Sequence, residues 1–181
     1  MSKNILILWL GAFGFAVARH LSENNSEQIF YTGEKNPEIF QSIQKTRKHP
    51  YFFRDVMLPG NIKLVGDADL RPLLEKTDII ISAIPCQFLA AAFSELKDHL
   101  KDGVIILNLA KGINNQTLKT SSETLEEVLW DENYSYAYLA GGMIAEELVA
   151  WNKLGADIVT EDSEAWTILK KLVSIPIFLE M

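Results

Sequence analysis

Six consecutive uncharged residues, Ile5–Leu10, run directly into a turn marked by Gly11 and Gly14. A continuous apolar run of this kind is typical of a parallel strand that is covered on both faces. The segment that follows, Ala12–Glu23, has the pattern of a helix and ends in a polar turn. This part of the chain therefore predicts a buried strand, a tight turn and a helix.

The same alternation continues to the end of the sequence. Further strands are predicted at Gln28–Thr32, Ile62–Val65, Asp78–Ala83, Val104–Leu109, Tyr136–Leu139, Ala156–Thr160 and Ile175–Leu179. Helices are predicted at Pro37–Lys48, Asp69–Lys76, Pro85–His99, Thr120–Trp130, Met143–Trp151 and Ser163–Val173. Strands that alternate with helices indicate an α/β fold with a doubly wound, mostly parallel sheet and helices on both faces. A length of 181 residues is that of about one domain, so we expect residues 1–181 to form a single one.

The first strand has one competing interpretation. Lys3 precedes an uncharged run that ends in Ala16-Val17-Ala18 before Arg19, which is close to the outline of a signal peptide. The run is too short to span a membrane. We favour the strand because later segments supply its partners; a mature chain starting at Arg19 would instead indicate an exported protein.

Charge and cysteine content narrow the classes of function. Seventeen basic and 24 acidic side chains give a net charge of −7, which argues against an extended nucleic-acid surface or an anionic membrane as the main partner. The single cysteine, Cys86, allows no internal disulfide, and the three histidines have no metal-ligand spacing. We expect no metal site and a reducing, cytoplasmic location.

The turn after the first strand carries most of a dinucleotide-binding motif. In such sheets ligands lie beyond the carboxyl ends of the strands, and the motif there is G-x-G-x-x-G. Gly11 and Gly14 supply the second and third glycines, while Trp9 stands at the first position. Glu34, at the end of the second strand, is placed to accept from a ribose 2′-hydroxyl and to repel a 2′-phosphate, which favours NAD over NADP. The alternative is a pair of glycines that packs the helix, with no cofactor.

Five segments in order and spacing resemble one family. They are Gly11–Gly14, Leu58–Ile62, Ile84–Gln87, Ala110–Gly112 and Ala140–Glu147. Together they are similar to the N-terminal, dinucleotide-binding domain of bacterial-type NAD(P)-dependent glycerol-3-phosphate dehydrogenase. The resemblance implies a Rossmann-like fold and interconversion of sn-glycerol 3-phosphate and dihydroxyacetone phosphate by hydride transfer, with NAD as the cofactor.

The resemblance also implies roles for individual residues. Cofactor contacts are expected from Gly11, Ala12, Phe13, Gly14, Glu34, Pro85, Lys111 and Ala145. Lys111 would be catalytic, because it would lie near both nicotinamide and substrate and favour an anionic or polarised oxygen. Substrate contacts are expected from Lys111, Gly141 and Met143.

Departures from the family pattern support a second hypothesis. Trp9 replaces a glycine, Met143 a serine or threonine, and Gly142 a proline. The sequence ends at Met181, where the family's helical C-terminal domain, with its acid/base lysine, would follow. We therefore expect little or no turnover from these residues alone, and either a homodimer or a separate partner carrying the C-terminal domain. The alternative function is a non-catalytic module that senses a nucleotide or binds a protein.

Overall fold

The computed structural model describes residues 2–25, 28–152, 154–173 and 178–179. Eight strands and seven α-helices alternate along these residues, together with a short 3-10 helix, η1 (Lys97–His99). The strands are β1 (Asn4–Leu8), β2 (Ile29–Gly33), β3 (Ile62–Val65), β4 (Ile79–Ser82), β5 (Val104–Asn108), β6 (Tyr134–Ala140), β7 (Gly155–Val159) and β8 (Phe178–Leu179). The helices are α1 (Ala12–Asn24), α2 (Pro37–Thr46), α3 (Asp67–Leu74), α4 (Cys86–Leu96), α5 (Ser121–Val128), α6 (Ala145–Val149) and α7 (Ser163–Val173).

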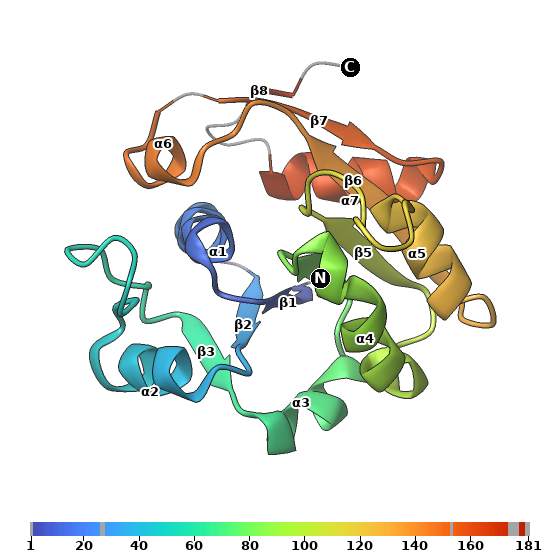
Figure 1. Ribbon diagram of the computed structural model, residues 1–181. Coiled ribbons are helices and arrows are strands. Elements are labelled where there is room, and N and C mark those ends of the chain that lie inside the picture. Colours follow the sequence, from blue (N-terminus) through green and yellow to red (C-terminus); the bar gives the residue numbers. More distant parts are fainter. Residues whose placement is uncertain (1, 26–27, 153, 174–177, 180–181) are drawn as a thin grey trace.

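The strands form one sheet in the order β3-β2-β1-β4-β5-β6-β7-β8 (Figure 1). Parallel pairing joins the first six of these, and β1 lies in the middle, where Ile5 pairs with Phe30 of β2 and with Ile79 of β4. Only the β6–β7 pair is antiparallel within the described residues. The predicted mostly parallel, doubly wound sheet is confirmed.

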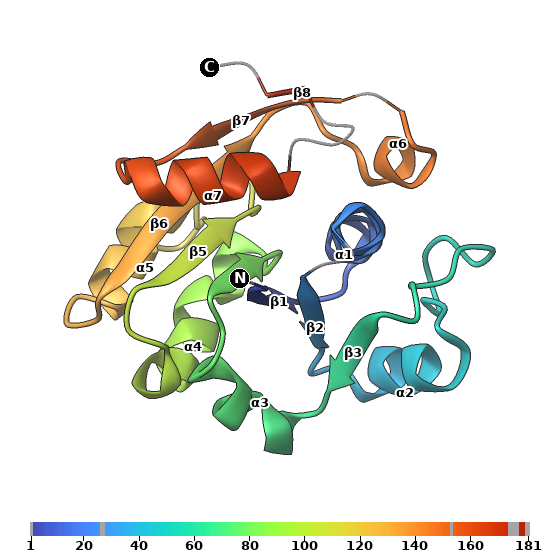
Figure 2. The same ribbon diagram turned by 180° about the vertical axis from the view of Figure 1, so that it is seen from behind.

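Alternate side chains of β1 enter the two cores on opposite sides of the sheet. Ile5 and Ile7 pack with residues of α1, α2, α6 and α7, whereas Leu6 and Leu8 pack with residues of α3, α4 and α5. All four side chains are at most 4% exposed. Figures 1 and 2 show these two sets of helices on the two faces, with α1 beside α6. This burial on both faces explains why β1 reads as a continuous apolar run.

The central position of β1 also bears on the signal-peptide interpretation. Residues 4–8 hydrogen-bond to strands on both sides, so removal of residues 1–18 would take away the middle of the sheet together with half of α1. The structure therefore favours the strand.

Element boundaries differ from prediction where tertiary contacts override the local pattern. The helix predicted at Pro37–Lys48 ends at Thr46, because Arg47 adopts φ +61° and donates its guanidinium to carbonyls of Leu58, Pro59 and Ile62. Strand β6 begins two residues early, at Tyr134, since Val104 of β5 pairs with it. The last predicted strand is confirmed at Phe178–Leu179; residues 175–177 lie outside the described residues.

A buried histidine organises the loop between α2 and β3. Nδ1 of His49 accepts from the backbone N–H groups of Tyr51 and Phe52, each at 3.1 Å. The imidazole is 1% exposed and meets the ring of Phe15 edge-on, with the ring centres 5.8 Å apart. Burial lowers the pKa of His49, and the nearby backbone of Leu10 partly opposes this shift.

This arrangement predicts that the protein loses stability in mild acid. Because its folded-state pKa is lowered, His49 binds a proton more readily in the unfolded chain, and a protonated Nδ1 cannot accept from the loop. The contribution is fully present above about pH 6.5, the ordinary pKa of histidine, and is lost as the pH falls through the lower folded-state value. Urea unfolding of the native chain and of His49→Gln between pH 7.5 and 5 should show a shallower pH dependence in the variant. His99→Gln, at a partly exposed histidine, is the control; equal slopes for native chain and His49→Gln would contradict this prediction.

Candidate functional site

The sheet has its reversal of strand order at β1. The chain passes from β1 outward to β2 and β3 and then returns to β4 on the other side of β1. The connections on the two sides of this point lie on opposite faces, which opens a crevice beyond the carboxyl ends of β1 and β4. Two turns border it: residues 9–11 lead from β1 into α1, and residues 83–85 lead from β4 into α4.

The glycine turn packs as the motif requires. A Cβ on Gly14 would lie 2.1 Å from the carbonyl oxygen of Trp9 and 3.0 Å from the Cβ of Ala83. Helix α1 can therefore approach β1 and β4 only with glycine at this position. Gly11 is the N-cap of α1 and has no side chain to accept from the first N–H groups of the helix. The first turn of α1 also contains no acidic residue. Unpaired N–H groups at such a helix start suit an anion.

Glu34 holds the same turn from the second strand. One carboxylate oxygen accepts from the N–H of Leu10 and the other from the N–H of Asn36, each at 2.8 Å. A carboxylate oxygen has two acceptor positions, so each retains one for a ligand hydroxyl. Glu34 thus supports the turn and has acceptor capacity beyond these two backbone contacts.

A cavity of about 440 Å³ adjoins the crevice and gathers six of the predicted site residues. These are Ala12, Phe13, Pro85, Lys111, Met143 and Ala145. Gly11, Gly14, Glu34 and Gly141 do not line it; the first three border the glycine turn instead. The cavity thus brings together predicted residues that are up to 133 positions apart in the sequence, from Ala12 to Ala145.

Lys111 is the cation of this cavity. Its Nζ donates to the carbonyl oxygen of Met143 at 3.0 Å and lies 5.9 Å from the ring centre of Phe13. An ammonium has three donors, so two remain for other acceptors. The Lys111 ammonium thus lies at the mouth of the crevice, where three segments meet. Lys111 itself is in the turn after β5, Met143 directly precedes α6, and Phe13 is in the first turn of α1.

The side chain and the backbone of Met143 have different surroundings. Its side chain is 3% exposed and packs in the core with α1, so the thioether is not presented to a ligand. The backbone carbonyl, which accepts from Lys111, is the group that faces the cavity. A substrate contact from Met143 stays a prediction.

Gly141 has a structural explanation of its own. Its φ is +132°, and a Cβ there would lie 2.6 Å from the carbonyl oxygen of Gly155. Packing of β6 against β7 therefore requires glycine at this position. A substrate contact from its backbone stays a prediction.

Seven further residues line the cavity, although no individual role was assigned to them from the sequence. They are Ala83, Cys86, Gln87, Leu109, Ala110, Ile144 and Glu146. All follow strand ends, so the rule that ligands lie there is the signal that finds them. Among them Cys86 is 5% exposed, and its thiol donates to the carbonyl of Ile113.

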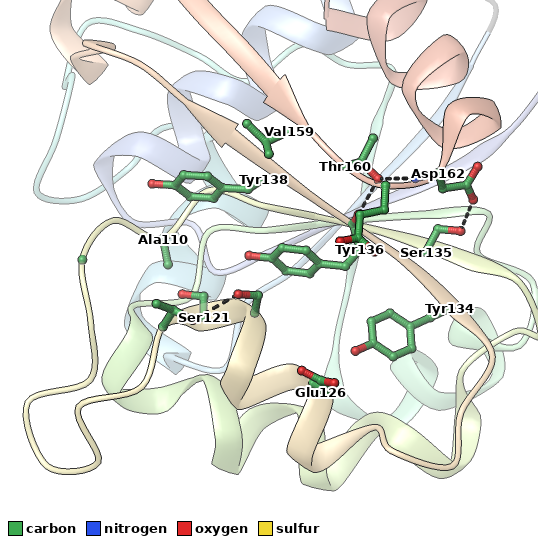
Figure 3. Close-up of a pocket in the computed structure, with 14 residues that line it drawn as sticks. Ala110, Ser121, Glu126, Tyr134, Ser135, Tyr136, Tyr138, Val159, Thr160 and Asp162 are labelled. Atoms are coloured by element: carbon green, nitrogen blue, oxygen red, sulfur yellow. Dashed lines mark hydrogen bonds between the residues drawn. The ribbon is translucent and has the colours of Figure 1, made fainter.

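A larger cavity, of about 1020 Å³, is lined mainly by residues of β6 and α5 and shares Ala110 with the smaller one (Figure 3). Tyr134, Tyr136 and Tyr138 project from one face of β6 toward α5, and Glu126 lies opposite them. Burial raises the pKa of Tyr136 to about 12, so its hydroxyl stays neutral at physiological pH. This cavity has no cation among its lining residues, and we place the candidate site in the smaller one, at the strand ends.

Among the described residues, no three or more histidine, cysteine, aspartate or glutamate side chains lie close enough to bind a metal ion together. None of the described helices combines the length and apolar character of a membrane span.

The strand order and the glycine turn after β1 define a dinucleotide-binding domain of the doubly wound α/β class. Comparison with known proteins makes this specific. Residues 4–165 match the family described as NAD-dependent glycerol-3-phosphate dehydrogenase N-terminus, and the chain belongs to that family. The resemblance noted in the sequence is thereby confirmed.

Individual relatives agree with the family match. The chain is 29% identical over 176 residues to the glycerol-3-phosphate dehydrogenase [NAD(P)+] of Syntrophotalea carbinolica, which covers 97% of this chain and 52% of the relative. It is 32% identical over 145 residues to that of a Thermoanaerobacter species, covering 80% of this chain and 42% of the relative. The glycerol-3-phosphate dehydrogenase structure from Coxiella burnetii shares the fold, with a TM-score of 0.88, 17% identity and coverage of 98% of this chain and 53% of that chain. The chain thus spans about half the length of the relatives it matches.

Proposed function

We propose that residues 1–181 form the cofactor-binding domain of an NAD-dependent glycerol-3-phosphate dehydrogenase, which interconverts sn-glycerol 3-phosphate and dihydroxyacetone phosphate. The observation that carries the proposal is the convergence of Phe13, Lys111 and Ala145 on one cavity beside the glycine turn. The family match supports the same function.

In this function the nicotinamide ring, when bound, supplies the hydride chemistry. Lys111 would stabilise negative charge on the reacting substrate oxygen through the ammonium protons that Met143 does not accept. Phe13, Pro85 and Ala145 give the cavity apolar walls beside Lys111, against which a nicotinamide ring would pack. Gly141 and the backbone of Met143 would line the substrate side.

Calorimetric titration of the chain with NADH tests the proposal. We expect saturable binding, and weaker binding for Lys111→Met, which keeps the length of the side chain and removes its charge. Lys119→Met, at an exposed lysine paired with Glu127, is the matched control. The variant Trp9→Gly, which has glycine at the first position of the motif, is titrated as well. If neither the native chain nor Trp9→Gly binds NADH at millimolar concentration, the proposal is overturned.

A non-catalytic nucleotide-binding module is the second candidate, because Trp9 occupies the position of the first motif glycine. Assay of dihydroxyacetone phosphate reduction separates the two. The chain is assayed alone and with the helical C-terminal domain of a relative added in trans. Turnover that appears only with the added domain supports the enzyme; binding of NADH with no turnover in either case supports the module.

We further propose that the cofactor is NAD rather than NADP, on the strength of Glu34. Its carboxylate would accept from the ribose 2′-hydroxyl and repel a 2′-phosphate. The native chain should bind NADH more tightly than NADPH, and Glu34→Gln should reduce that preference about tenfold while it keeps one acceptor for the turn. Glu38→Gln, on the exposed surface of α2, is the control. An unchanged NADH-to-NADPH ratio in Glu34→Gln would contradict this assignment.

The proposed substrate partner is a small phosphorylated triol or ketone. Assembly with a second copy or with a separate C-terminal domain belongs to the same proposal, since the relatives are about twice as long as the chain. A reducing cytoplasmic location fits the free thiol of Cys86.

A further inference from the structure

Trp9 has a backbone conformation that its side chain does not favour. Its φ is +72°, in the left-handed region where glycine is readily accommodated and a bulky residue is strained. The N–H of Trp9 donates to the carbonyl of Gly33, and its own carbonyl faces the glycine position at residue 14. The turn thus keeps the shape of the glycine motif although its first glycine is gone.

The indole lies over the turn. Its Nε1 and Cδ1 are 3.3 and 3.4 Å from the point that a Cβ on Gly11 would occupy. Gly11 is the position at which the motif lets backbone approach a pyrophosphate. The indole therefore covers the same surface that a dinucleotide must contact.

A second aromatic ring holds the indole in this place. Phe88, from the first turn of α4, stacks on Trp9 with ring centres 5.6 Å apart and planes inclined by 15°. The two residues are 37% and 54% exposed. The stacked pair bridges the ends of β1 and β4 at the mouth of the crevice, whereas the cavity around Lys111 has neither ring in its lining.

The crevice therefore has two parts, which fit the two halves of a dinucleotide cofactor to different degrees. Around Lys111 the cavity is open and suits the nicotinamide half of a cofactor. Over Gly11 the indole is where the pyrophosphate would lie, so that part does not fit a dinucleotide unless the indole leaves Phe88.

We propose that Trp9 is a specificity-determining residue that disfavours the adenosine-diphosphate part of a dinucleotide and leaves binding of a nicotinamide mononucleotide unaffected. The inference rests on the proposed function. Binding of NADH must break the stack with Phe88 and displace the indole, whereas the reduced mononucleotide needs neither. An aromatic stack of this kind corresponds to a change in affinity of up to about tenfold.

Calorimetry with two ligands tests the inference. NADH and reduced nicotinamide mononucleotide are titrated into the native chain, Trp9→Gly and Trp9→Ala. We expect both variants to bind NADH about tenfold more tightly than the native chain and to bind the mononucleotide within about twofold of it. Trp9→Ala removes the indole and keeps a Cβ at positive φ, so a gain shared by both variants comes from the indole and not from relief of the backbone. Trp130→Ala, at a tryptophan that is 77% exposed, is the control.

The other outcomes are distinct. Equal affinity for NADH in the native chain and both variants overturns the inference and leaves the proposed function standing. A gain in Trp9→Gly alone also overturns it, because the backbone would then be the cause. An equal gain for both ligands overturns it as well, since the indole would not discriminate between them. If none of the three chains binds NADH or the reduced mononucleotide, the proposed function is overturned, and the inference with it.

Discussion

Replacement of Gly14 by alanine is expected to destabilise the protein by about 3 kcal/mol, although alanine is ordinarily the better helix residue. The added Cβ would lie 2.1 Å from the backbone oxygen of Trp9, and the Cβ of Ala83 closes the other side at 3.0 Å. Neither neighbour is the end of a flexible side chain, so α1 must move away from β1 and β4. Urea unfolding monitored by circular dichroism measures the loss.

The same movement would disturb the crevice, because the start of α1 carries Ala12 and Phe13. NADH binding by Gly14→Ala should therefore weaken in parallel with its stability. Gly60→Ala is the control: no heavy atom lies within 4 Å of a Cβ there, and its stability should stay within about 0.5 kcal/mol of the native chain. A Gly14→Ala chain as stable as Gly60→Ala would mean that the close approach of α1 is not required.

Replacement of Gly141 by alanine is expected to cost about 3 kcal/mol as well. Two effects add: φ is +132°, which a residue with a side chain rarely adopts, and the new Cβ would lie 2.6 Å from the carbonyl oxygen of Gly155. The antiparallel pairing of β6 with β7 should open at Ala140, which pairs with Asp157. Thermal and urea unfolding, with hydrogen exchange of the β7 amides, measure the effect.

The adjacent glycine provides the matched control. A Cβ on Gly142 meets nothing within 4 Å, so Gly142→Ala should be close to native in stability. If Gly141→Ala instead keeps its stability and loses only ligand binding, the glycine serves the substrate, as the family resemblance implies, and the packing explanation is wrong.

The fold was largely predictable because burial on both faces leaves a clear pattern. The runs that became β1, β4 and β5 are almost wholly apolar, and the strands they form are buried throughout apart from Asn4. Helix ends were less predictable, since distant groups decide them: the guanidinium of Arg47 reaches carbonyls beyond the loop, and this ends α2 at Thr46.

The site was predictable in its residue types and less so in its geometry. The glycine turn, Glu34 and Lys111 were found because each directly follows a strand or belongs to a family motif. The direction of the Met143 side chain was not predicted, because packing against α1 decides whether this side chain enters the core or the cavity. Glu146 was given no role either, because the sequence does not show which residues lie opposite it in the cavity.

The sequence alone determined the class of fold, the position of the glycine turn and the family, because these depend on residue types in a fixed order. It also showed that Trp9 stands where a glycine is expected. Only the tertiary structure decided what Trp9 does. The stack on Phe88 and the cover over Gly11 arise because β1 and β4 end side by side, with Leu8 paired to Ser82, 74 residues later in the chain. The physical reason is that composition and spacing carry local preferences, whereas the packing of two strand ends fixes which surfaces meet.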